Sequence, residues 1–258
     1  MNLGLHNKNA LVCGSTQGIG KATAIQLAQE GANITLIARN EEKLRQVLTE
    51  LPNDNQTHQY IVADFTNPTG LFEKLKERTI SYHILVNNTG GPAGGPVFSA
   101  KLAEFEMAFT QHLKCNHVLV QALVPFMKSE GYGRIINIIS TSVKQPLDGL
   151  GVSNTIRGAV ANWSKTLANE LGQFAITVNN VLPGATATER LNEIIGNKAN
   201  KSKKSIEEVT ETMKNASPAK RFAKPEEVAN AIVFLASEKA SFINGINVPV
   251  DGGRTKSL

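Results

Sequence analysis

The chain is poor in the residues that mark several protein classes. Its 258 residues include two cysteines, one tryptophan and three tyrosines, and aromatic residues make up 5% of the total. Two cysteines exclude a disulfide-rich scaffold, and their spacing is not that of metal ligands, so no metal site is expected. Cys13 and Cys115 lie in apolar stretches and are predicted to be buried free thiols.

Long apolar runs are also missing. No stretch approaches the roughly 20 residues that a membrane-spanning helix needs, and the first eight residues lack the apolar core of a signal peptide. We therefore expect a cytoplasmic protein with no membrane partner.

The charge balance is basic but evenly spread. The net charge is +5 and only residues 198–204 form a lysine cluster. A basic cluster can bind nucleic acid, but this one has no interleaved aromatic residues on which bases could stack. We expect a solvated loop there and no nucleic-acid partner.

Short β-rich apolar runs alternate with helix-length segments from end to end. The predicted strands are residues 9–13, 34–37, 59–63, 84–87, 134–139, 176–181 and 246–250. The predicted helices are residues 18–30, 41–51, 68–79, 103–129, 152–174 and 225–237. The strands lack polar–apolar alternation, which is typical of sheets covered by helices on both faces.

This alternation predicts an α/β fold with right-handed crossovers. We expect a single-domain, doubly wound Rossmann fold over residues 1–258, with a seven-stranded parallel sheet of order 3-2-1-4-5-6-7 and helices on both faces. A polar helical segment at about residues 188–219 interrupts the strand–helix alternation, and we expect it to cover a substrate like a lid.

A glycine-rich turn joins the first predicted strand to the first predicted helix. It reads Gly14-Ser15-Thr16-Gln17-Gly18-Ile19-Gly20. Glycines let the backbone turn tightly and approach a pyrophosphate, which the free N–H groups and the helix dipole attract. A merely tight strand–helix turn is the alternative interpretation of this motif taken alone.

Several separate motifs resemble the short-chain dehydrogenase/reductase family, in particular its 3-oxoacyl-ACP-reductase-like members, from about Lys8 to Gly253. The motifs are the glycine-rich turn, Asn87-Asn88-Thr89-Gly90, Ser140, Pro183-Gly184 and Asp251-Gly252-Gly253. The resemblance implies a nicotinamide dinucleotide cofactor, a small carbonyl or alcohol as substrate, and a homo-oligomer, either a dimer or a tetramer.

The resemblance also implies which residues meet the cofactor. Asp64 would meet the adenine ring, unless it only caps its own loop, and the turn at Asn88 would brace the adenosine side. Thr186 and Thr188 would bind the carboxamide or a phosphate. The full set comprises the glycine-rich turn with Arg39, Asp64, Phe65, Asn88, Thr89, Gly90, Arg157, Pro183, Gly184, Thr186 and Thr188.

The choice between the two nicotinamide cofactors depends on the end of the second strand. A carboxylate there would bind the ribose 2′-hydroxyl of NAD, whereas a basic side chain would pair with the 2′-phosphate of NADP. The sequence is Ile37-Ala38-Arg39-Asn40, with one arginine and no carboxylate. It favours NADP(H) over NAD(H), although Gln17 stands where NADP-binding relatives often carry a second basic residue.

The predicted reaction centre departs from the family pattern. Ser140 matches the family serine, but Ser153 stands where the resemblance places a catalytic tyrosine and Arg157 where it places a lysine. Their i, i+4 spacing keeps these two residues on one helix face. His112 aligns with the family asparagine, and Asn116 one turn later is a partial substitute.

Two interpretations of this centre follow. In the first, His112, with an ordinary pKa near 6.5, moves the proton, Ser140 and Ser153 donate to the developing oxyanion, and Arg157 adds positive charge or holds ribose hydroxyls. This interpretation predicts a divergent oxidoreductase. In the second, losing the general acid, which typically costs about 10²–10⁴ in rate, leaves an inactive NADP(H)-binding sensor or assembly subunit.

Overall fold

One parallel sheet organises the computed structural model, which describes residues 1–77 and 81–257. Its seven strands lie in the order β3-β2-β1-β4-β5-β6-β7, and every neighbouring pair is parallel. The predicted fold class and strand order are confirmed. The strands are β1 (Asn9–Cys13), β2 (Asn33–Ala38), β3 (Gln59–Val62), β4 (Ile84–Asn87), β5 (Gly133–Ile138), β6 (Ile176–Pro183) and β7 (Asn247–Val250).

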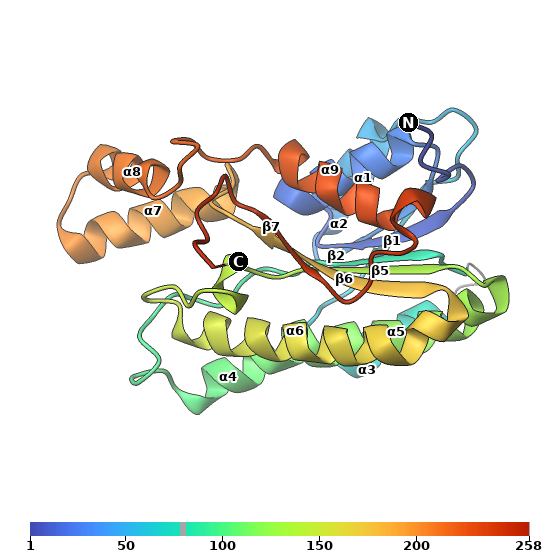
Figure 1. Ribbon diagram of the computed structural model, residues 1–258, viewed down its shortest axis with the longest axis horizontal. Helices are drawn as coiled ribbons and strands as arrows, with labels where there is room; N and C mark the ends of the chain where they lie inside the picture. Colours follow the sequence, from blue (N-terminus) through green and yellow to red (C-terminus); the bar gives the residue numbers. More distant parts are fainter. Residues whose placement is uncertain (78–80, 258) are drawn as a thin grey trace.

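Helices cover both faces of the sheet (Figure 1). One face carries α1 (Gly18–Gln29), α2 (Glu41–Glu50) and α9 (Pro225–Ala236). The other carries α3 (Pro68–Lys76), α4 (Leu102–Phe109), α5 (Cys115–Glu130) and α6 (Gly151–Leu171). Each layer encloses a hydrophobic cluster between its helices and the sheet. Cys13 and Cys115 lie in the second of these clusters as buried free thiols, as predicted.

One predicted helix differs from the observed structure in an instructive way. The predicted helix 103–129 contains a π-helical turn, Thr110–Lys114, between α4 and α5. Such a turn takes one extra residue, and the smooth apolar pattern does not disclose it. The end of the predicted helix 68–79, at residues 78 and 79, lies outside the described residues.

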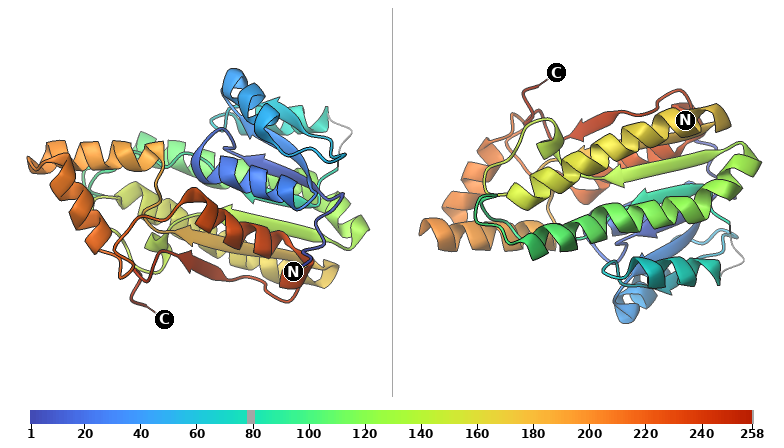
Figure 2. Two further views of the ribbon diagram at one scale, coloured as in Figure 1. Left: turned by 90° about the horizontal axis from the view of Figure 1, so that it is seen from above. Right: turned by 90° about the horizontal axis from the view of Figure 1, so that it is seen from below.

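The polar segment forms two helices, α7 (Glu189–Ser202) and α8 (Ile206–Asn215). They project beyond the sheet at the edge where the strands end (Figure 2). The lysine cluster was expected in a loop. Lys198 and Lys201 instead lie in the last turns of α7, where cations stabilise the negative end of the helix dipole, and Lys203 and Lys204 follow the helix.

A ladder of asparagine amides crosses the four neighbouring strands β4, β5, β6 and β7. Asn87 donates to Asn137 at 2.8 Å, Asn137 donates to Asn180 at 3.0 Å, and Asn180 donates to Asn247 at 2.8 Å. These residues are direct partners in the register of β4, β5, β6 and β7. Because buried amides must be hydrogen-bonded, a slip of one strand would break the ladder, which therefore stabilises the alignment of the strand ends.

Of the helices in residues 1–77 and 81–257, none is both long enough and apolar enough to cross a bilayer.

Candidate active site

The sequence-predicted residues converge on the carboxyl edge of the sheet. Gly14 follows β1, Asn88 follows β4, Ser140 follows β5 and Gly184 follows β6. The strand order reverses between β1 and β4, and the crevice outside such a reversal is where doubly wound sheets bind ligands. The topology therefore brings both halves of the predicted site together.

The glycine-rich turn packs closely against the end of β4. Gly14 adopts φ +57°, and a Cβ there would lie 2.6 Å from the carbonyl oxygen of Asn88. A Cβ on Gly20 would overlap the carbonyl oxygen of Gly14. Asn88 seals the contact by donating its side-chain amide to that same oxygen at 3.2 Å. Only glycine fits at these two positions.

The start of α1 is open to an anion. Gln17, the residue before the helix, makes no side-chain cap hydrogen bond, and the first turn contains no acidic residue. The N–H groups of that turn are thus left for a ligand, and the helix dipole favours a negative one. This arrangement fits the pyrophosphate of a dinucleotide.

Some residues of the predicted cofactor set turn their side chains away from the crevice. The hydroxyl of Ser15 is buried and accepts from the backbone N–H of Ile37 at 3.1 Å. Phe65 is buried in a core cluster, and Ile19 packs partly into the other. Their side chains serve the fold, so only their backbone groups remain for a cofactor.

Asp64 caps its own loop. Its carboxylate accepts from the N–H of Thr66 at 2.9 Å, while the residue stays exposed at the end of β3. This is the arrangement that the alternative interpretation of Asp64 expected. The carboxylate has further lone pairs, so it can still accept another hydrogen bond.

The two threonines after β6 are engaged locally. Thr186 is buried and donates to the carbonyl of Gly184 at 3.1 Å. Thr188 caps α7 by accepting from the N–H of Leu191 at 3.3 Å, and it donates to the carbonyl of Thr186 at 3.2 Å. These bonds shape the segment beside Pro183, and a Cβ on Gly18 would lie 3.0 Å from the Thr188 side chain. The segment therefore reaches the start of α1.

The outer end of the crevice is exposed and basic. Arg39 directly follows β2, and Gln17 precedes α1 on the glycine-rich turn. Both side chains are exposed, whereas Thr16 is half-buried within the turn. A Cβ on Gly90, three residues after β4, would meet nothing within 4 Å, so a side chain would find space at this position.

The reaction end combines Ser140 with the start of α6. Ser140 is half-buried and its hydroxyl accepts from the N–H of Ser142 at 3.1 Å, which caps a short 3-10 turn. That hydroxyl keeps its own proton for another acceptor. Ser153 is half-buried in the first turn of α6.

Arg157 lies beneath this end as a buried cation. It is 8% exposed, and its guanidinium donates to the carbonyl of Ile138, at the end of β5, at 2.8 Å. Burial lowers the pKa of Arg157 to about 10, so the side chain is still charged at neutral pH. Within residues 1–77 and 81–257 it forms no ion pair with a carboxylate. Its positive charge is therefore not neutralised by a carboxylate of the described residues.

His112 occupies the π-helical turn and is 1% exposed. Its Nδ1 lies 2.5 Å from the hydroxyl oxygen of Thr89, whereas its Nε2 is buried without a hydrogen-bond partner in the described part of the chain. Burial lowers the pKa of His112 to about 2, and the charge of Arg157 acts in the same direction. The expected ordinary pKa near 6.5 is therefore wrong, because an imidazolium would be desolvated beside a cation.

The tyrosines lie elsewhere. The hydroxyl of Tyr60 donates to Glu41 at 2.9 Å, and that of Tyr132 donates to the carbonyl of Ala236 at 2.7 Å. Tyr82 is buried in a core cluster and precedes β4, at the opposite edge of the sheet. In the described residues, no phenol stands near Ser140.

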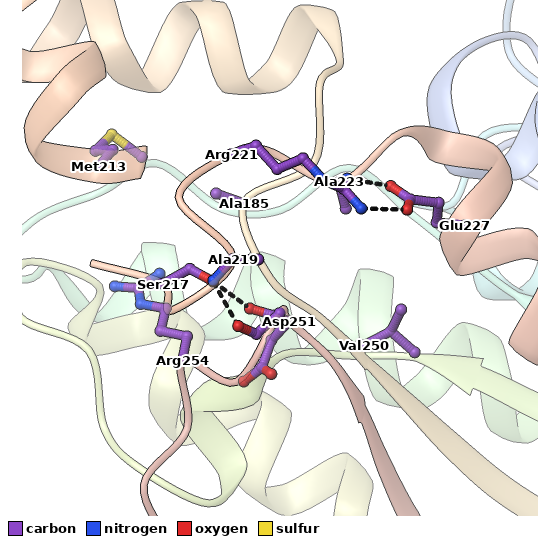
Figure 3. Close-up of a pocket in the computed structure, with 11 residues that line it drawn as sticks. Ala185, Met213, Ser217, Ala219, Arg221, Ala223, Glu227, Val250, Asp251 and Arg254 are labelled. Atoms are coloured by element: carbon purple, nitrogen blue, oxygen red, sulfur yellow. Dashed lines mark hydrogen bonds and ion pairs between the residues drawn. The ribbon is translucent and has the colours of Figure 1, made fainter. Parts of the chain in front are cut away.

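A pocket that the sequence did not indicate lies next to the end of β6 (Figure 3). It measures about 140 Å³ and lies between Ala185, Met213 of α8, Val250 of β7 and Arg254. Arg221 is paired with Glu227 at 2.6 Å along its rim. A Cβ on Gly184 would lie 2.7 Å from the Cα of Asp251, so this pocket abuts the segment that borders the crevice.

The chain is similar to known proteins along nearly its whole length. Residues 14–255 match the family model described as enoyl-(acyl carrier protein) reductase. The chain is 30% identical over 259 residues to the NADPH-dependent reductase BacG of Bacillus subtilis (strain 168), covering 98% of this chain and 100% of that protein. It is 32% identical over 254 residues to L-xylulose reductase of Caenorhabditis elegans, covering 98% and 97%.

A solved structure agrees along the whole length. The L-sorbose reductase of Gluconobacter frateurii, crystallised with NADPH and L-sorbose, superposes with a TM-score of 0.93 at 32% identity and 100% coverage of both chains. The chain therefore belongs to the short-chain dehydrogenase/reductase family.

Proposed function

We propose that this protein is a divergent NADP(H)-dependent oxidoreductase that acts on a small carbonyl or alcohol. The observation that carries the proposal is the glycine-rich turn, where an acid-free helix start faces the same crevice as Ser140. The NADPH dependence of BacG and the NADPH bound in the L-sorbose reductase structure support the choice of cofactor.

The crevice has a place for each part of the cofactor. The backbone from Gly14 to Gly20 would hold the pyrophosphate, Arg39 the 2′-phosphate, and the segment from Pro183 to Gly184 would border the nicotinamide. When bound, the cofactor supplies or accepts a hydride. The residues of this chain must then stabilise the substrate oxygen and manage its proton.

His112 acts in this proposal as a neutral hydrogen-bond donor. If the Thr89 hydroxyl donates to Nδ1, the proton of the imidazole is on Nε2, the buried atom without a partner among the described residues. A neutral imidazole with a depressed pKa can polarise a carbonyl without carrying charge. The field of Arg157 would stabilise the alkoxide, and the hydroxyls of Ser140 and Ser153 would donate to it.

A second function, cofactor binding without redox turnover, is favoured by a specific observation. The described residues place no phenol at the crevice, and the pKa of His112 near 2 leaves no imidazolium to act as a strong acid at neutral pH. In that case the protein would report or carry the bound dinucleotide as a sensor or assembly subunit.

Oxidation of NADPH in the presence of a panel of small ketones and aldehydes separates the two functions. We expect turnover with part of the panel, and we expect His112→Gln to lower kcat by about 10², the typical cost of losing one oxyanion donor. His83→Gln is the matched control, since His83 lies at the opposite edge of the sheet and should leave kcat unchanged. NADPH binding without oxidation on any member would support the second function.

We also propose that the protein is a cytoplasmic homo-oligomer, dimeric or tetrameric, and that its α7–α8 segment covers the substrate. Large apolar side chains are exposed at Phe98, Leu102 and Met107 around α4, and at Phe242 before β7. Such side chains support contacts between copies on two surfaces.

A further inference from the structure

Lys43 reaches from α2 to the glycine-rich turn. Its Nζ lies 3.5 Å from the side-chain oxygen of Gln17, the residue before α1. Its own backbone N–H is held by the cap residue Asn40 at 2.9 Å, which fixes the root of the side chain at the start of α2. The ammonium thus lies beside the N-termini of two helices, although 26 residues separate it from Gln17 in sequence.

Arg39 and Lys43 are unpaired cations at this place. Both are exposed, and neither forms an ion pair with a carboxylate in the described portion of the chain. Of the two nearby carboxylates in the first turn of α2, Glu41 is held by Arg45 at 2.7 Å and by the hydroxyl of Tyr60. Glu42 is exposed and leaves a net positive charge of one when it is counted against Arg39 and Lys43.

The position of these cations matches one part of a dinucleotide. In this fold the pyrophosphate lies on the glycine-rich turn, and the adenosine ribose lies toward the end of β2. A cation between Gln17 and the start of α2 would therefore lie near the 2′ oxygen of that ribose. A phosphate there carries up to two negative charges and is best held by two cations.

We propose that Lys43 is a specificity-determining residue that binds the 2′-phosphate of NADP(H) together with Arg39. It supplies from α2 the second positive charge that neutral Gln17 does not supply from the turn. The inference rests on the proposed function, because it assigns a residue within the same cofactor site.

Binding of two cofactor fragments by calorimetry tests this role without any need for turnover. The probes are 2′,5′-ADP, which carries the 2′-phosphate, and 5′-AMP, which lacks it. We expect Lys43→Gln to weaken 2′,5′-ADP binding about tenfold and Lys43→Glu about hundredfold, with 5′-AMP binding changed less than about twofold. Lys43→Arg should restore affinity for 2′,5′-ADP, and Lys239→Gln, at the opposite edge of the sheet, is the charge-matched control.

The outcomes distinguish this inference from the proposed function. If the wild-type protein binds 2′,5′-ADP no better than 5′-AMP, both the NADP(H) preference and the role of Lys43 are wrong. If the wild-type protein prefers 2′,5′-ADP but Lys43→Gln leaves that preference intact, only the role of Lys43 is wrong. An equal loss for both fragments would show that Lys43 supports the fold of the turn and does not read the 2′-phosphate.

Discussion

The two ends of the crevice are built from different parts of the chain. At the dinucleotide end, the turn from Gly14 to Gly20 presents backbone N–H groups, and a Cβ on either glycine would collide with backbone atoms. At the reaction end, side chains are presented by Ser140, just after β5, and by Ser153 and Arg157 of α6. The first end depends on the absence of side chains and the second depends on their chemistry.

This difference determines how each end tolerates substitution. A backbone cradle keeps its function as long as the strand–turn–helix geometry holds, whatever the neighbouring side chains are. A proton-handling centre changes with every side chain, because hydroxyl, imidazole and guanidinium groups differ in acidity by many pKa units. A protein can therefore retain a complete cofactor cradle while its reaction chemistry diverges.

The comparison is tested most strongly by placing a phenol and an ammonium at the reaction end. We expect Ser153→Tyr with Arg157→Lys to raise NADPH-dependent carbonyl reduction by about 10²–10⁴, the usual contribution of a positioned general acid. The matched control, Ser153→Phe with Arg157→Lys, has the same ring without the hydroxyl. Equal rates for the two double variants would mean that the crevice does not aim a substrate at this position.

The dinucleotide end should be much less tolerant of added atoms. We expect Gly20→Val to lower the free energy of unfolding by about 3 kcal/mol, because its Cβ overlaps the backbone oxygen of Gly14. The Kd for NADPH should rise by at least about 100-fold, as the turn loses its shape. Calorimetry and chemical denaturation measure both effects.

Gly196→Ala is the control for that variant, because a Cβ at this position in α7 has nothing within 4 Å. It should change stability by less than about 1 kcal/mol. Unchanged NADPH affinity in Gly20→Val would contradict the assignment of the turn as the pyrophosphate site.

The smallest effect is a dependence of stability on pH at the reaction end. Folding depresses the pKa of His112 from 6.5 to about 2, so in this range the unfolded chain binds a proton that the folded chain does not. The contribution of neutral His112 to the free energy of unfolding is therefore fully present above pH 6.5 and is lost as the pH falls toward 2. Between about pH 7.5 and pH 5 the loss should reach about 2 kcal/mol.

Urea denaturation across that pH range measures the loss. His112→Gln should remove most of it, since glutamine stays neutral. His83→Gln should remove a smaller share, because partial burial, together with Lys8, lowers the pKa of His83 as well. An identical pH slope in the wild-type protein and in His112→Gln would show that His112 is not held neutral by burial.

Much of the fold was predictable because it repeats a local pattern. Each strand is a short apolar run and each crossover is a helix-length segment, so β1 and β4 were located to the residue. The π-helical turn at Thr110–Lys114 was not predictable, since the apolar pattern runs on through it. The glycine-rich turn was recognisable from the spacing of its glycines. The buried hydroxyl of Ser15 and the core position of Phe65 were not, because both depend on neighbours far along the chain.

The amino-acid order by itself determined the strand–helix alternation, the glycine-rich turn and the presence of Ser153 and Arg157 at the start of α6. Only the tertiary structure decided that the imidazole of His112 is buried beside Arg157, and that Lys43 lies against Gln17. The reason is physical: backbone geometry follows from local residue types, whereas a pKa and a charge pair depend on burial and on distances between segments that only folding brings together.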